Sequence, residues 1–476
     1  MAVIRSFESR GIARARLPSW KGSRSRGLPR RGAKRHLFAV LLCIGGGAAC
    51  ADDQTTAVSQ LHKGELANGA EWVLEMPAAW NGTLIIVSRG YFAGPGKRTN
   101  YSLNDSLELQ HRLLSEGYAF IGSSYSANGW AVEEGMADQM AVLDLFEERF
   151  GSPQTVIAFG KSMGGLISIG MVEKWPDRIH GAMPVCASAS GSVPMMNVAL
   201  DGMFVVKTLL NPGIRIVTPP DENADRALAA RTVSEHMETP EGRARLTLAA
   251  ALAQIPDWTT AESPPAENDI AGRQREMLQS FLLGSMLPRG DQERRAGGNF
   301  SWNVGVDYTE LLDRSGQRAL VEQVYREAGL DLTEDLRKLN NAERITADPD
   351  AAAYMEANYV PTGDLQRPVL LMHTLGDGMT VPALTTGFAT RVARAGKSDL
   401  LRRLYVERAD HCTFTSRELE IGLKTLLTRI RTGQWPETTA AHLNRSGGGR
   451  GDAATAFTDR QPPTMTRPES TLPLAR

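Results

Sequence analysis

The stretch Gly160-Lys161-Ser162-Met163-Gly164 fits the pattern G-x-S-x-G and is the most informative part of this chain. Apolar residues 155–159 precede it and predict a buried strand, and the run that begins at Gly165 predicts a helix. A serine between a strand and a helix lies on a sharp, strained turn with its hydroxyl exposed, and glycines avoid collisions there. The pattern therefore predicts a nucleophile, Ser162. The alternative is a glycine-rich turn with a bystander serine.

The acid and the histidine that such a serine needs follow it in chain order. Asp377 follows an apolar run in a loop flanked by glycines, and His411 follows a second apolar run. A histidine has to take the proton of Ser162, and a buried carboxylate has to orient and stabilise the imidazole. We therefore expect Ser162, Asp377 and His411 to act together. The alternatives are that Asp377 is only a turn aspartate and His411 only a surface histidine. His373 is a weaker candidate for the histidine because it lies inside a predicted strand, and Asp410 is a weaker candidate for the acid because it directly precedes His411 and would point elsewhere.

Composition and charge exclude some classes of function. The chain has 476 residues, of which 42% are hydrophobic, enough for one large core with an insertion. Its net charge is −1, but residues 1–36 contribute ten positive charges, so the remainder carries −11. That remainder predicts no basic surface for nucleic acid. No histidine and cysteine cluster has ligand spacing, so we expect no metal site and no cofactor.

The basic leader is followed by a short apolar run that ends in Ala49-Cys50-Ala51, an A-x-A-like site. The run is too short for a comfortable membrane span. We interpret residues 1–51 as a signal peptide cleaved before Asp52, which predicts a periplasmic or extracellular protein with no membrane span in the mature chain. The basic segment before the apolar run is long for a signal peptide. A misplaced start codon or a twin-arginine signal at Arg30-Arg31 would explain its length. An uncleaved anchor and lipid attachment at Cys50 are alternatives.

Two cysteines remain after such a cleavage. Cys186 ends a strand-like run, and Cys412 directly follows His411. Two cysteines in an exported protein suggest one disulfide, which would hold the histidine loop close to Ser162. Two separate buried thiols are the alternative.

The order of predicted elements divides the chain. Residues 52–189 alternate strands and helices, which predicts the first half of a mostly parallel sheet flanked by helices. Residues 190–363 are rich in helical patterns and predict a helical cap, unless this insertion only adds stability. The sheet resumes in residues 364–436. Residues 437–476 are rich in Thr, Pro, Gly and Arg, lack apolar periodicity and predict a disordered tail.

Four segments resemble secreted bacterial α/β-hydrolases of the serine esterase and prolyl-oligopeptidase-like type. They are residues 86–91, 117–120 running on to 129–132, 160–165 and 411–415. The resemblance implies the α/β-hydrolase fold with a large helical cap. It also implies a catalytic triad of Ser162, Asp377 and His411.

The same resemblance implies an oxyanion hole built by the backbone N–H groups of Met163 and Tyr91. Arg89 stands where that family commonly has His-Gly, a change that a backbone donor survives. Tyr125 and Trp130 lie on a loop after a strand's carboxyl end, where open α/β sheets bind ligands. Together with Arg89 they are candidates for substrate contact. Ordinary loop packing is the alternative.

The function predicted from these features is a secreted serine hydrolase that cleaves a carboxylic ester of a small molecule through an acyl-enzyme, without a cofactor. A serine peptidase or amidase of the prolyl-oligopeptidase-like type is the nearest alternative. A non-catalytic binding protein on the same fold is an alternative of a different class. The intact order of Ser, Asp and His favours the enzyme, because a binding protein does not need all three.

Overall fold

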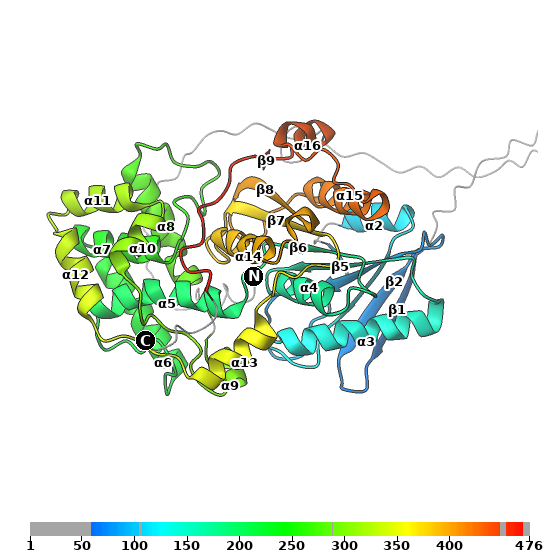
Figure 1. Cartoon of the computed structure of the whole chain (residues 1–476), viewed down its shortest axis with the longest axis horizontal. Coiled ribbons are helices and arrows are strands. Elements are labelled where there is room, and N and C mark those ends of the chain that lie inside the picture. The colour runs from blue at the N-terminus through cyan, green and yellow to red at the C-terminus, as the bar shows by residue number, and fades with distance from the viewer. Residues whose placement is uncertain (1–58, 104–106, 288, 448–453, 470–476) are drawn as a thin grey trace, which may run out of the picture. The chain divides into compact units, whose positions relative to one another are not determined.

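The computed structural model describes residues 59–469 except 104–106, 288 and 448–453. The predicted signal peptide, residues 1–51, and Cys50 lie outside the described residues. One sheet of nine strands runs through the molecule in the order β1-β2-β4-β3-β5-β6-β7-β8-β9 (Figure 1). The strands are β1 (Gln60–Glu65), β2 (Glu71–Met76), β3 (Thr83–Ser88), β4 (Ala119–Ser123), β5 (Thr155–Lys161), β6 (Gly181–Val185), β7 (Val369–Gly376), β8 (Leu401–Ala409) and β9 (Phe457–Thr458).

The six neighbouring strands β4, β3, β5, β6, β7 and β8 are parallel to one another. The strands at the two ends of the sheet, β1 with β2 and β9, are antiparallel to the strands they pair with. The central strands β3 and β6 are buried along their whole length, as expected of parallel strands covered on both faces. Because parallel strands end at the same edge, the loops after β3, β5, β6, β7 and β8 meet there. The predicted mostly parallel sheet is confirmed.

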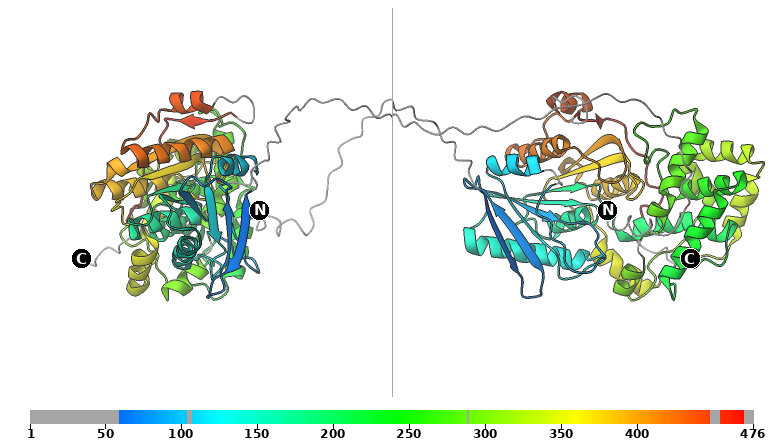
Figure 2. Two further views of the ribbon diagram at one scale, coloured as in Figure 1. Left: turned by 90° about the vertical axis from the view of Figure 1, so that its right-hand side faces the viewer. Right: turned by 180° about the vertical axis from the view of Figure 1, so that it is seen from behind.

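Helices cover both faces of the sheet (Figures 1 and 2). The side chains of β3 divide between two apolar clusters in the same way. Leu84 and Ile86 belong to one apolar cluster, whereas Ile85 and Val87 belong to another, because successive side chains of a strand point to opposite faces. The first cluster includes residues of α3 (Val132–Phe150), α4 (Met163–Lys174) and α14 (Ala383–Arg394), and the second those of α2 (Leu107–Ser115) and α15 (Ser416–Thr432).

The segment between β6 and β7 is helical throughout its regular structure (Figure 1, green to yellow). Its first helix is buried from residue 192 to residue 206, which fits an apolar sequence without a polar face. The helices are α5 (Ser192–Leu209), α6 (Glu222–His236), α7 (Pro240–Leu252), α8 (Ile270–Ser285), α9 (Gly290–Ala296), α10 (Tyr308–Arg314), α11 (Arg318–Glu327), α12 (Leu332–Asn341) and α13 (Pro349–Tyr359).

Polar contacts join this helical insertion to the start of α3. Arg295 of α9 binds both carboxylate oxygens of Glu134, at 2.6 and 2.8 Å. The hydroxyl of Tyr359 donates to Glu133 over 2.8 Å. These partly buried, charge-assisted bonds fix α9 and α13 against the sheet half of the molecule.

The expected disordered tail is wrong for the part of residues 437–476 that the structure describes. Residues 440–447 form α16 (Ala440–Gly447), β9 pairs with β8, and Met465 is buried. Arg467 binds both oxygens of the buried Asp201 on α5, at 3.0 and 2.9 Å. These distant partners order the segment although its own sequence has no apolar periodicity. For that reason the composition of the segment wrongly predicted disorder.

Candidate active site

Ser162 lies between the end of β5 and the start of α4 with φ 58° and ψ −125°. This left-handed backbone is strained for a residue with a side chain. A Cβ on Gly160 would lie 2.0 Å from the Gly164 oxygen, and one on Gly164 would lie 2.1 Å from the Ser88 oxygen. Both glycines are therefore required, and the strand–turn–helix predicted around Ser162 is present.

Asp377 follows β7 and is fully buried. One carboxylate oxygen, Oδ1, accepts the backbone N–H groups of Met379 and Thr380, each over 2.9 Å. The other oxygen, Oδ2, lies 2.7 Å from Nδ1 of His411. The structure thus brings together the acid and the histidine that the sequence placed 34 residues apart.

Thr380 is a member of this cluster that the sequence did not indicate. Its hydroxyl lies 2.9 Å from Asp377 Oδ2, 3.1 Å from His411 Nδ1 and 2.9 Å from the backbone oxygen of Cys186. The available signal was weak: an aspartate accepting from N–H groups two and three residues later is a common turn. Nε2 of His373, in β7, donates to the backbone oxygen of Thr380 over 2.7 Å and lies 3.5 Å from Asp377 Oδ2.

Electrostatics couple Asp377 and His411. Burial by itself raises the pKa of the Asp377 carboxyl, but the facing imidazole of His411 and bonds from both neighbouring histidines outweigh it and hold that pKa well below its usual range. Burial lowers the pKa of His411, yet the charge and hydrogen bond of Asp377 raise it above its ordinary 6.5. The arrangement therefore stabilises an imidazolium beside a carboxylate, the charge state that forms when histidine takes a proton.

A disulfide joins Cys186, after β6, to Cys412, with Cα atoms 5.4 Å apart. Both cysteines adopt positive φ, 43° and 63°. The predicted bridge is confirmed, and it ties the residue after His411 to the end of the strand beside Ser162. Cys186, His411 and Cys412 have ligand atoms within 4.8 Å of one another, but both sulfurs are used by the disulfide.

The loop after β3 passes directly against Ser162. A Cβ on Gly90 would lie 3.4 Å from the Ser162 Cβ, which is van der Waals contact distance. Tyr91 is the next residue, and Met163 is the first residue of α4, whose N–H has no carbonyl within the helix to bind. Both backbone groups predicted for an oxyanion hole are thus located on segments that border Ser162.

The three candidates for substrate contact make internal contacts. Arg89 is buried; its guanidinium donates to the Ser124 oxygen over 2.9 and 2.8 Å and lies 4.3 Å from the Tyr125 ring centre. The Tyr125 hydroxyl donates to the Arg89 oxygen over 3.1 Å, and the Trp130 indole N–H donates to Ser192 over 2.7 Å. These bonds brace the loop that carries Tyr91, and substrate contact by the three side chains stays a prediction.

The helical insertion reaches the acid and histidine loops. The Thr259 oxygen accepts the N–H of Asp410 over 2.9 Å. A Cβ on Gly378 would lie 2.3 Å from the Ser280 Cβ, and one on Gly284 would lie 2.5 Å from the Gly378 oxygen. Helix α8 therefore packs tightly on the loop that holds Asp377.

Comparisons with known proteins give one curated relative and several distant structures. No protein-family model matches this chain. The chain is similar to an o-phthalyl amidase from Xanthobacter agilis, with 28% identity over 417 residues that cover 80% of this chain and 89% of the relative.

Among the described residues, no helix is both long and apolar enough to span a membrane.

Two solved esterases overlap this chain at low similarity. An esterase from Aspergillus oryzae has 14% identity and a TM-score of 0.40, covering 80% of each chain. An esterase from Pyrococcus furiosus has 11% identity and a TM-score of 0.37, covering 80% of this chain and 93% of the esterase. The fold is assigned from the strand order and the strained serine turn, not from these overlaps.

Proposed function

Because this chain is an α/β-hydrolase by fold, we propose that it is a serine hydrolase in which Ser162, His411 and Asp377 form a catalytic triad. The observation that carries the proposal is the 2.7 Å contact between His411 Nδ1 and the buried Asp377, at the sheet edge where Ser162 lies on its strained turn. This is the charge arrangement that activates a serine hydroxyl. It is exported in our proposal, which the Cys186–Cys412 disulfide supports.

In the proposed reaction, the Ser162 oxygen attacks a carbonyl carbon while His411 takes the hydroxyl proton at Nε2. The negative charge on the carbonyl oxygen is stabilised by the N–H groups of Met163 and Tyr91. His411 then gives the proton to the departing alcohol or amine, which leaves an acyl group on Ser162. Water, activated by the same histidine, releases the acyl group as a carboxylic acid.

The Ser162 hydroxyl has no hydrogen bond to the described residues. Catalytic hydrogen bonds are commonly long in the free enzyme and tighten when substrate binds. A Ser162 hydroxyl without a hydrogen bond in the free protein is therefore compatible with the proposed mechanism.

The bond cleaved is an ester or an amide of a small carboxylic acid. The sequence patterns favour the ester. The similarity to an o-phthalyl amidase over most of both chains favours the amide as the second candidate, and specifically an aromatic acyl group. Matched phenyl esters and anilides of the same aromatic acids separate the two by their kcat/KM.

A fluorophosphonate probe tests the triad, because it reacts with activated serines. We expect labelling of the wild type, loss of labelling in Ser162→Ala, and a fall in turnover of at least about a thousandfold. Ser152→Ala, at an exposed serine before β5, is the matched control and should behave as wild type. Wild-type turnover in Ser162→Ala refutes the proposal, and a folded, unlabelled wild type favours a non-catalytic binding protein.

A further inference from the structure

Residues 258–261, between α7 and α8 in the helical insertion, lie against the loops of the proposed acid and histidine. The Thr259 oxygen accepts the N–H of Asp410, the residue before His411, over 2.9 Å. The same N–H lies 3.0 Å from the Gly376 oxygen at the end of β7. One backbone N–H of the histidine loop is therefore shared between the sheet and the insertion.

The two residues that flank Asp377 also contact this segment. A Cβ on Gly376 would lie 2.8 Å from the Trp258 oxygen, and one on Gly378 would lie 3.1 Å from Cγ2 of Thr259. Both distances are shorter than an ordinary van der Waals contact. The segment therefore touches the acid loop on both sides of Asp377, and it touches the histidine loop as well.

Glu276 of α8 fixes segment 258–261 in this conformation. Its Oε2 accepts the backbone N–H groups of Thr259, Thr260 and Ala261, over 2.9, 2.7 and 3.0 Å. Its own backbone oxygen accepts the Thr259 hydroxyl over 2.7 Å. Three consecutive N–H groups that converge on one oxygen fix the backbone of the segment, because a rotation within it would leave one of these donors without its acceptor.

Glu276 is a buried carboxylate whose charge is stabilised by hydrogen-bond donors. The residue is 2% exposed and forms no ion pair within the described part of the chain. Burial raises the pKa of its carboxyl, but the three backbone N–H bonds outweigh burial and lower that pKa below its ordinary value. The carboxylate is therefore ionised at neutral pH, and bonds to a charged acceptor are roughly twice as strong as neutral ones.

The conformation of Asp410 affects His411 directly. Asp410 has a positive φ of 70°, and its carboxylate Oδ1 accepts the N–H of His411 over 2.7 Å. A positive φ is costly for a residue with a side chain, so neighbouring contacts have to maintain it. The Thr259 oxygen supplies one of these contacts from the insertion.

We propose that Glu276 is a positioning residue of the triad: it fixes segment 258–261, and this segment holds the histidine loop against the acid loop. The helical insertion then contributes to the geometry of the triad from outside the sheet. This inference rests on the proposed function, since the position of His411 affects turnover only if His411 serves Ser162.

Glu276→Ala tests the proposal kinetically, on a substrate that the wild type cleaves. Small misplacements of catalytic groups are costly, so kcat should fall about 10- to 100-fold while KM stays near the wild-type value. The pKa of His411 is raised by the nearby charge of Asp377, so a displaced His411 should move the midpoint of kcat/KM against pH down toward 6.5. An unchanged midpoint overturns the proposal, whatever the change in kcat.

Glu276→Gln separates the hydrogen bonds from the charge. It removes the same charge but keeps an oxygen that accepts N–H groups, so both changes should be smaller than in Glu276→Ala. An equal shift of the midpoint in both variants would attribute the shift to the lost charge and overturn the proposal. If Glu276→Ala does not fold, Glu276→Gln is compared with Glu262→Gln, which makes the same charge change at an exposed residue of the same loop. Equal midpoints in these two variants then overturn the proposal.

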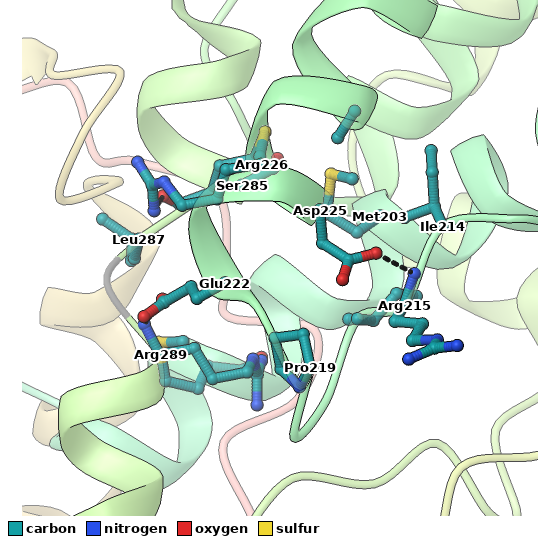
Figure 3. A pocket seen from close by; sticks show the side chains of 14 residues that line it. Met203, Ile214, Arg215, Pro219, Glu222, Asp225, Arg226, Ser285, Leu287 and Arg289 are labelled. Atoms are coloured by element: carbon teal, nitrogen blue, oxygen red, sulfur yellow. Dashed lines mark hydrogen bonds between the residues drawn. The ribbon is translucent and has the colours of Figure 1, made fainter.

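A second control variant separates positioning from stability. Met203 of α5 lies in the wall of a cavity of about 50 Å³, which α6 and the C-terminal end of α8 also line (Figure 3). No residue of segment 258–261 lines this cavity. Met203→Ala should therefore lower the melting temperature through lost packing in the insertion and keep the wild-type midpoint.

Hydrogen exchange, measured by mass spectrometry in the Ser162→Ala protein, detects the same connection without turnover. Adding Glu276→Ala should speed exchange in peptides that cover residues 408–413 relative to peptides of β5, whereas adding Met203→Ala should leave that ratio unchanged. Unchanged exchange at 408–413 in the Glu276→Ala protein overturns the proposal. If the fluorophosphonate does not label Ser162 while exchange rises as expected, the proposed function fails and the hold of Glu276 on the histidine loop stands.

Discussion

Replacing Thr380 by valine tests whether this residue positions the acid and the histidine. Valine keeps the shape of threonine but removes the hydroxyl that lies within 3.1 Å of Asp377, His411 and the Cys186 oxygen. The hydroxyl has one hydrogen, so it donates to one of the two acceptors at a time, while its oxygen can accept from the His411 N–H. A hydrogen bond to a charged group contributes about 1.5 to 3 kcal/mol.

That range corresponds to roughly a 10- to 150-fold loss in kcat if the bond is equally important in the transition state. Thr380 is 3% exposed and does not face a substrate, so we expect KM to stay near the wild-type value. Steady-state kinetics of Thr380→Val, with Thr380→Ser as the variant that restores the hydroxyl, measure this split. Thermal melting of both proteins measures any change in stability. Wild-type kcat in Thr380→Val, or a rise in KM alone, would refute the positioning role.

Four further predictions concern charge and covalent links. Since Asp377 raises the pKa of His411 above 6.5 and only neutral imidazole accepts a proton, kcat/KM should rise with pH through a midpoint above 6.5; a midpoint below that value contradicts the coupling. The extra stability from protonated His411 is present below pH 6.5 and lost as pH rises through the raised pKa, which urea unfolding at several pH values measures. Cys412→Ser or reduction should lower kcat more than it weakens substrate binding, because the histidine loop loses its tie; unchanged kinetics in fully reduced protein would count against this. Arg467→Ala leaves the buried Asp201 without its charged partner, with the Tyr308 hydroxyl still donating to it, and should cost about 3 kcal/mol of unfolding free energy; a loss under 1 kcal/mol would show that the tail contributes little.

The parts of the site that the sequence predicted are those with local patterns. Gly160 and Gly164 flank Ser162 in the chain, so the turn and its steric need can be read from neighbouring letters. Asp377 and His411 follow apolar runs in the order expected for this fold, and parallel strands bring their loops to one edge.

Other features depend on partners that only the folded chain supplies. Arg89 is a candidate for substrate contact by its place in the sequence, but its guanidinium donates to backbone oxygens of another loop. Arg467 lies in a stretch with the composition of a disordered tail, and its order depends on Asp201, 266 residues away. The composition of a segment indicates how much apolar surface that segment can bury by itself. It does not indicate whether a distant part of the chain supplies a partner such as Asp201.

The disulfide also sets the time at which the site can be completed during synthesis. Cys186 and Cys412 are separated by 226 residues, and the whole helical insertion lies between them. When Ser162 and Cys186 have been synthesised, the growing chain therefore still lacks His411, Asp377 and Cys412. In the proposed triad, Ser162 has no acid or histidine to activate it until the insertion has been made and the last parallel strands have joined the sheet, and the disulfide can close only after that point. If Ser162 is the nucleophile that we propose, its synthesis therefore precedes the assembly of its partners.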